Sequence, residues 1–158
     1  MDLDKVIKYS GYTAAGLYVL IGFIVSFEVI SRYIFNAPTI WVNEISRLLQ
    51  IWATYLALTY TFHNEEFIRI TVFYDKANDK TKKVLDLISF IFIIYFSSFD
   101  TYYGGLISYD FFEVGRTSST ILDLPAVITV IAIPISFALL LIRVFLEILR
   151  YMRDFIKS

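Results

Sequence analysis

The sequence of 158 residues contains no cysteine and only one histidine, His63. Without thiols, the chain has no disulfide framework, no thiolate metal centre and no cysteine nucleophile. A single imidazole excludes a haem held by two histidines of this chain and argues strongly against a histidine-based zinc site. The sequence also shows no Ser–His–Asp arrangement and no glycine-rich loop that would hold phosphate, so it predicts neither an enzyme nor a bound cofactor.

Charge is scarce as well. Asp, Glu, Lys and Arg make up 18% of the chain, the net charge is −1, and no basic stripe of the kind that binds nucleic acid is present. Apolar residue types reach 58%, aromatic types 18%, and the mean hydropathy is +0.65. A soluble domain is about half apolar and about a quarter charged. A chain this short cannot bury so much apolar surface in water, so the sequence predicts an all-α membrane protein.

Four stretches have the length and polarity of transmembrane helices, which need about 20 mostly apolar residues. They cover about residues 9–34, 42–62, 84–107 and 124–146. The first has no charge between Lys8 and Glu28, which is too long for the apolar core of a signal peptide, so we expect a retained helix. At the fourth, Asp123 is the expected N-cap, Pro125 fits the first turn, and Pro134 should kink the helix.

The positive charges predict one orientation for this single domain, residues 1–158. With a cytoplasmic N-terminus, eleven basic residues fall inside: Lys5, Lys8, Arg69, Lys76, Lys80, Lys82, Lys83, Arg143, Arg150, Arg153 and Lys157. Three fall outside: Arg32, Arg47 and Arg116. Because lysine and arginine concentrate on the cytoplasmic side of membrane proteins, both termini are predicted to be cytoplasmic.

Opposite charges recur near the outer ends of the first two predicted helices. Glu28 and Arg32 are four residues apart, and Glu44 and Arg47 are three apart, so each pair shares one helix face. Intramembrane charges usually face protein or water. Two interpretations follow: a structural charge network, whose disruption by Arg47→Ala should destabilise the protein, or an ion or substrate pathway. The network interpretation is favoured because acids and arginines lie at matching depth.

Two further charges belong to the same outer region. Asp100, in the third predicted helix, lacks a partner on its own helix, and Arg32 or Arg47 is its candidate partner. Arg116 falls in the loop just above. Together with the two helical pairs, Asp100 and Arg116 complete a charged rim on which another protein could dock.

Small and aromatic residues mark candidate packing surfaces. Gly11, Ala15 and Gly22 form a stripe of small residues on the first helix. Trp41 directly precedes the second predicted helix, and Trp52 lies in its middle. In lipid, small residues let helices approach closely. Contact with a partner and packing within this chain both fit the pattern.

Few residues on the predicted cytoplasmic side suggest a chemical role. His63 fits a polar stop at the inner end of the second helix better than a proton relay. Residues 67–74 alternate between apolar and polar types, which fits either a short interfacial helix or a strand-like stretch, and the lysines that follow fit anionic headgroups.

One stretch of the sequence carries a more specific motif than the features described above. Residues 32–38 read Arg-Tyr-Ile-Phe-Asn-Ala-Pro, followed by Trp41, by Glu-Ile-Ser-Arg at 44–47, and by Trp52. This order closely resembles the small membrane subunit of TRAP transporters, the DctQ-like family. Residues 66–69, Glu-Phe-Ile-Arg, resemble the family's inner-loop motif. The approach to the fourth helix is also similar, in Gly115, Ser118, Thr120, Leu122, Pro125, Ile133 and Pro134.

The resemblance implies a multi-pass protein of the bacterial inner membrane that serves as scaffold in a Na⁺-coupled, binding-protein-dependent transporter. The implied partners are a large DctM-like permease, which would hold the substrate and Na⁺ sites, and a periplasmic DctP-like binding protein. The implied substrates are organic acids such as C4-dicarboxylates or sialic acid. The alternative is a stand-alone, proton-coupled efflux carrier that uses Glu28. The off-centre position of Glu28, with Arg32 one turn away, argues against the carrier.

Overall fold

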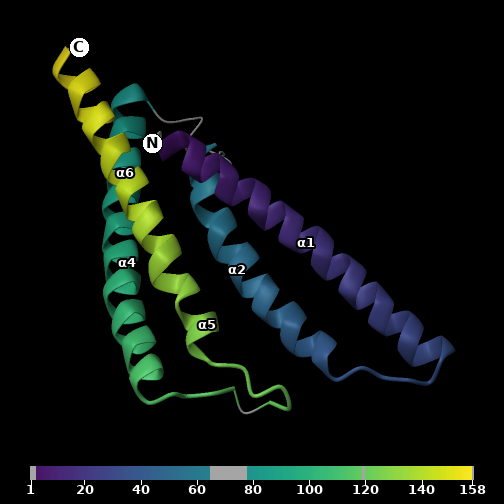
Figure 1. Ribbon diagram of the computed structural model, residues 1–158. Coiled ribbons are helices and arrows are strands. Elements are labelled where there is room, and N and C mark those ends of the chain that lie inside the picture. Colours follow the sequence, from purple (N-terminus) through teal and green to yellow (C-terminus); the bar gives the residue numbers. More distant parts are fainter. Residues whose placement is uncertain (1–2, 65–77, 119, 158) are drawn as a thin grey trace.

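The computed structural model describes residues 3–64, 78–118 and 120–157, and its regular elements are helices (Figure 1). They are α1 (Leu3–Ile34), α2 (Trp41–His63), α4 (Asp79–Glu113), the short α5 (Val127–Val130) and α6 (Ala132–Lys157). Within the described residues, β-type pairing is limited to an isolated bridge between Thr117 and Pro125. The all-helical prediction is therefore confirmed. The inner-loop residues 66–74 considered above lie outside the described residues.

In the described part of the chain, three helical stretches have the length and composition to cross a membrane: Leu3–Ile34, Val84–Glu113 and Val127–Leu149. They correspond to the first, third and fourth predicted spans. The second, α2, is less apolar because it carries Glu44 and Arg47. Its 23 residues nevertheless extend about 35 Å at 1.5 Å per residue, which exceeds a hydrocarbon core of about 30 Å. That α2 also spans the membrane remains a prediction.

The fourth predicted span is interrupted rather than continuous. Pro134 has no N–H to donate to the carbonyl of Val130, and its ring crowds that carbonyl. Helix α5 ends at Val130 and α6 begins at Ala132, so the expected kink is a break between two helices. A polypeptide stretch that crosses a membrane region with such a break needs neighbouring groups to satisfy the freed carbonyls.

The prediction that Asp123 caps this helix was wrong. Asp123 has a positive φ of 51° and donates its own N–H to the carbonyl of Thr120, whereas the N-cap of α5 is Ala126. Two further backbone hydrogen bonds, from Ser118 N to Leu124 O and from Ala126 N to Arg116 O, close residues 116–126 into a loop. Because these residues belong to the loop, the helix begins after Asp123 rather than at it.

The long helices form an open row rather than a closed bundle. Helix α1 packs on α2, α2 packs on α6, and α6 packs on α4, as Figure 1 shows. The core between them is thin and consists of Ile7, Ala14, Val42, Ala53, Ala132, Leu140 and Val144. The chain exposes 11184 Å², compared with about 8,200 Å² for a compact protein of its mass. The row therefore leaves broad apolar faces open to lipid or to another protein.

The chain reverses direction between α1 and α2 and again between α4 and α5, and both reversals lie at the same end of the row. The α1–α2 connection, residues 35–40, and the α4–α5 connection, residues 114–126, lie opposite the two chain termini (Figure 1). We call these two ends the connection end and the terminal end. In the predicted orientation, the connection end faces the periplasm.

Candidate functional site: a carboxylate clamp and an open pocket at the connection end

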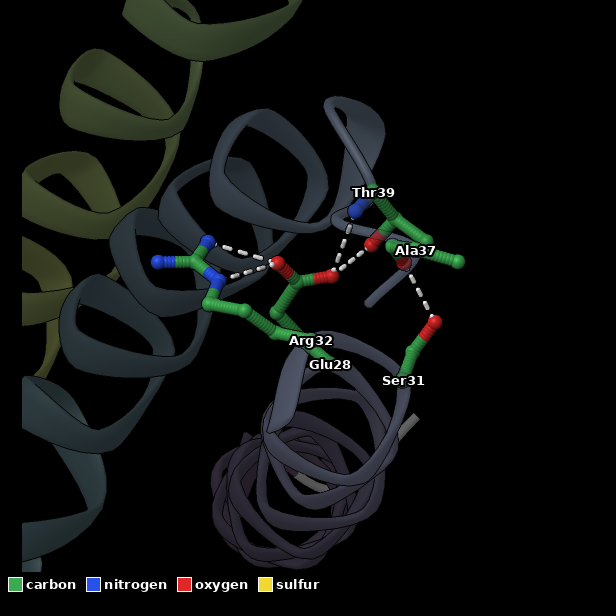
Figure 2. Close-up of polar contacts among 5 residues, drawn as sticks. All are labelled: Glu28, Ser31, Arg32, Ala37 and Thr39. Carbon is green, nitrogen blue, oxygen red and sulfur yellow. Dashed lines mark hydrogen bonds and ion pairs between the residues drawn. The ribbon is translucent and has the colours of Figure 1, made fainter. Parts of the chain in front are cut away.

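Glu28 fastens the α1–α2 connection to α1. Its Oε1 accepts hydrogen bonds from Arg32 Nε at 3.0 Å and from Arg32 Nη2 at 2.6 Å, and its Oε2 accepts from the backbone N–H of Thr39 at 3.0 Å. The Thr39 hydroxyl also donates to Oε2 (Figure 2). Glu28 itself is 5% exposed. We call Glu28, Arg32 and Thr39 the carboxylate clamp.

The turn that follows α1 brings Thr39 back to this carboxylate. Ser31 Oγ donates to the carbonyl of Ala37 at 2.6 Å (Figure 2). The N–H of Ala37 in turn donates to the carbonyl of Ser31 at 3.0 Å. Asn36 takes the left-handed conformation, with a φ of 49°, which asparagine tolerates better than most residues. Residues 32–39 therefore form a fixed turn that sets the spacing between α1 and α2.

The clamp contains the Glu28–Arg32 ion pair that the four-residue spacing predicts. Thr39 was not anticipated, because its contact with Glu28 depends on the path of the turn. Both carboxylate oxygens are engaged, so binding a proton or a cation at Glu28 requires loss of hydrogen bonds that hold the connection. The arrangement suits a structural joint.

Glu44 forms a second joint, between α2 and the α4–α5 connection. Its Oε2 accepts from Thr120 Oγ1 at 2.8 Å, and its Oε1 lies 3.3 Å from the backbone N of Leu122, which donates to it. Thr120 also shares a hydrogen bond with Ser118. The partners of Glu44 are more than 70 residues away in sequence, so the spacing to Arg47 suggested the wrong partner.

A pocket of about 520 Å³ opens beside this joint. One wall is a single face of α2 and the residue before it, and the other wall is the α4–α5 connection with α5. Its lining is Ile40, Asn43, Glu44, Arg47, Leu48, Ile51, Ser118, Thr120, Ile121, Leu124, Ala126, Thr129 and Val130. Trp52 ties the two walls together because its Nε1 donates to the carbonyl of Ile128 at 2.9 Å. The lining thus combines polar and apolar side chains in similar numbers.

The structure does not join the remaining predicted charges into one network. Arg47 is exposed at the pocket, Arg116 lies over the ring of Phe111 with 4.8 Å between the guanidinium carbon and the ring centroid, and Asp100 is partly exposed in the middle of α4. Within residues 3–64, 78–118 and 120–157, neither Arg47 nor Asp100 forms an ion pair. The expected Glu44–Arg47 pair and a pair between Asp100 and Arg32 or Arg47 are therefore not formed.

The stripe of small residues on α1 divides in two. Gly11 is buried against the ring of Tyr60 in α2, so it serves packing within the chain. Ala15 and Gly22 are exposed, and a Cβ at Gly22 would meet no atom within 4 Å. Trp41 is 40% exposed and lies beside Phe27, with 6.3 Å between the ring centroids.

The terminal end holds a polar cluster centred on Arg143, which the sequence reasoning treated only as a positive charge. Arg143 is 7% exposed, its Nε donates to His63 Nδ1 at 2.9 Å, and its Nη1 donates to Glu147. Asp4 Oδ1 lies 4.0 Å from His63 Nδ1. The four-residue spacing of Arg143 and Glu147 was the available signal. The hydrogen bond from Arg143 to His63 joins α6 to α2. This contact fits a polar residue that ends α2 better than a proton relay.

The described part of the chain contains no group of three or more His, Asp or Glu side chains that could hold a metal ion. The fold and its two joints define an all-helical integral membrane protein with large apolar faces. Residues 21–154 match the family of the DctQ component of tripartite ATP-independent periplasmic (TRAP) transporters, and the chain belongs to this family. It is therefore a component of a membrane transporter and no enzyme.

A curated relative supports this assignment. The chain is 26% identical over 141 residues to the isethionate TRAP transporter permease protein DctMQ of Oleidesulfovibrio alaskensis, an alignment that covers 84% of this chain. The same alignment covers 21% of the relative, so the chain spans about a fifth of that protein's length.

Proposed function

We propose that this chain is the small scaffold subunit of a Na⁺-coupled TRAP transporter that takes up an organic acid across the bacterial inner membrane. A large DctM-like permease would hold the substrate and Na⁺ sites, and a periplasmic DctP-like binding protein would deliver the substrate. Family membership supports the transporter class. The name of the relative, a permease for the sulfonate isethionate, supports a small organic anion as substrate, whether a sulfonate or a carboxylate such as a C4-dicarboxylate or sialic acid.

The observation that carries the scaffold role is the open row of helices. A carrier needs a polar path enclosed by its own helices, whereas this row has a thin core of mostly small and aliphatic residues and exposes most of α1 and α4. Such a row fits a broad wall that anchors a larger membrane protein in the bilayer. The mobile part of the permease would then move against a fixed neighbour.

The alternative, a proton-coupled carrier that uses Glu28, has less support. Glu28 accepts four hydrogen bonds, two of which come from Thr39 of the connecting turn. Releasing this carboxylate in each transport cycle would repeatedly open the joint between α1 and α2. A group that fixes two helices together is poorly suited to exchange protons.

The connection end is the proposed docking rim for the binding protein. Arg116 and Arg47 are exposed there, and Glu44 fixes the loop that carries Arg116. In the proposed orientation this rim faces the periplasm, where the binding protein resides. Rim charges of this kind act mainly on association rate and register rather than on raw affinity.

Reconstitution tests the proposed function. We expect no uptake of organic acid by liposomes that contain the small subunit alone, and Na⁺-dependent uptake when the large permease and the binding protein are added. The measurement is accumulation of labelled isethionate, a C4-dicarboxylate and sialic acid under an imposed Na⁺ gradient. Proton-driven transport by the small subunit alone would contradict the scaffold role.

Single-cysteine labelling tests the orientation, and the natural absence of cysteine makes every introduced thiol the only one. We expect a cysteine at Asn78 to react only from the cytoplasmic side and one at Ser118 to react from the periplasm. The measurement is labelling by a membrane-impermeant maleimide in intact and permeabilised cells. Labelling of Asn78 in intact cells would show that the proposed orientation is inverted.

A further inference from the structure

The middle of α4 carries a carboxylate that the described part of this chain does not neutralise. In the candidate span Val84–Glu113, sixteen residues precede Asp100 and thirteen follow it. At 1.5 Å per residue, Asp100 lies about 24 Å from the first residue and about 20 Å from the last. A hydrocarbon layer about 30 Å thick then contains Asp100 wherever it lies along this span.

Nothing in the described residues donates to this carboxylate. Asp100 is partly exposed and forms no hydrogen bond or ion pair there. An uncompensated charge in hydrocarbon is costly, and acidic residues inside membranes almost always face another protein group or water. Within residues 3–64, 78–118 and 120–157, Asp100 therefore has no compensating partner.

The residues around Asp100 indicate the side of α4 from which a compensating partner would approach. Ser97 and Gly104, on the neighbouring side of α4, are buried, and Gly104 packs against Ile133 and Pro134 of α6. At about 100° per residue, Phe96, Tyr103 and Ile107 lie within about 60° of Asp100 around the helix. All three are exposed. Asp100 thus opens onto an uncovered apolar surface.

The opposite side of α4 is different. A shallow groove there is lined by Ile91, Ile94, Tyr95, Ser98, Phe99 and Tyr102. Ser98 and Tyr102 are each about 160° from Asp100 around the helix. This groove is apolar and aromatic and carries no charge, which suits contact with lipid. The two sides of α4 are therefore chemically distinct.

We propose that the Asp100 face of α4, formed by Phe96, Asp100, Tyr103 and Ile107, docks on a membrane helix of the large permease that presents a basic side chain to Asp100. The partner's guanidinium or ammonium group supplies the charge and the donors that Asp100 lacks, and the flanking apolar residues exclude lipid from the pair. A buried carboxylate is stabilised only by a partner with good geometry and additional hydrogen bonds. This inference rests on the proposed function, because the partner is the large permease.

Substitutions at Asp100 in the two-subunit complex test the pairing. We expect Asp100→Leu and Asp100→Lys to lower recovery of the small subunit with an affinity-tagged large permease by about tenfold or more, because each leaves the partner's cation unpaired or repelled. Asp100→Glu should keep most of the complex. The matched control is Asp110→Leu, because Asp110 is an exposed carboxylate near the end of the same helix. The isolated subunit with Asp100→Leu should remain as stable as the parent.

Site-specific crosslinking gives a second, independent readout. A photoreactive residue at Ile107 should form an adduct with the large permease, whereas one at Ser98 should not. Parent-like recovery of both Asp100→Leu and Asp100→Lys, or adducts from Ser98 alone, would overturn the docking face. Failure of the parent small subunit to co-purify with the large permease would instead overturn the proposed function, and the docking face with it.

Discussion

Glu28→Ala should separate the α1–α2 connection from α1 and lower both the melting temperature of the subunit and its yield in the complex. The substitution removes the acceptor for Arg32 and for two donors of Thr39. A partly buried backbone N–H left without an acceptor, as at Thr39, costs about 1–3 kcal/mol. Thermal unfolding of the purified subunit, followed by tryptophan fluorescence, measures the effect.

Two control variants identify the cause. Glu28→Gln keeps one carbonyl oxygen for Thr39 but loses the charge that pairs with Arg32, so its melting temperature should fall between those of the parent and Glu28→Ala. Arg47→Ala should melt close to the parent, because Arg47 is exposed and its expected pair with Glu44 is not formed. Equal melting temperatures for all four proteins would mean that the clamp does not hold the turn.

Gly11→Leu should be the most disruptive substitution in the α1–α2 contact. A Cβ at Gly11 would overlap the ring of Tyr60, so the ring or the two helices would have to shift to make room. Overpacking of a tightly packed contact typically costs about 1–3 kcal/mol. We expect a lower melting temperature for the isolated subunit and a loss of the hydrogen bond between Tyr18 and Thr54, which bridges the same helices at 2.8 Å.

Gly22→Leu is the matched control on the same helix. A Cβ at Gly22 meets open space, and leucine is a better helix former than glycine, which costs about 0.8–1.0 kcal/mol relative to alanine. The isolated subunit should therefore be as stable as the parent or more so. If Gly22→Leu lowers only the recovery of the complex, the exposed half of the small-residue stripe contacts the partner. A melting temperature for Gly11→Leu equal to that of Gly22→Leu would contradict the assigned packing.

Local patterns predicted the helices well, because each depends on residues close together in sequence. The long charge-free run after Lys8 produces α1, the position of Pro134 predicts the break before α6, and the spacing of Glu28 and Arg32 predicts their ion pair. Apolar content and helical periodicity require no knowledge of the tertiary path. The same holds for the motif in residues 32–47, which correctly indicated the family.

The partners of the polar side chains were decided by the tertiary structure. Glu44 binds the loop at Thr120 and Leu122 rather than Arg47, and His63 accepts from Arg143, eighty residues away in sequence. The sequence shows which polar groups share one helix face. Which donor lies nearest to a given acceptor is determined by the tertiary structure.

The sequence alone therefore determined an all-helical membrane chain of the DctQ type, because lipid solvation imposes long apolar helices whatever their arrangement. Only the tertiary structure decided that these helices form an open row, that Glu28 fastens a turn, and that Asp100 faces outward without a partner in the described residues. The physical reason is that, in lipid, apolar side chains are satisfied on either side of a helix. Hydrophobicity therefore does not fix which faces meet, and close packing at residues such as Gly11 and hydrogen bonds between distant polar groups select the arrangement.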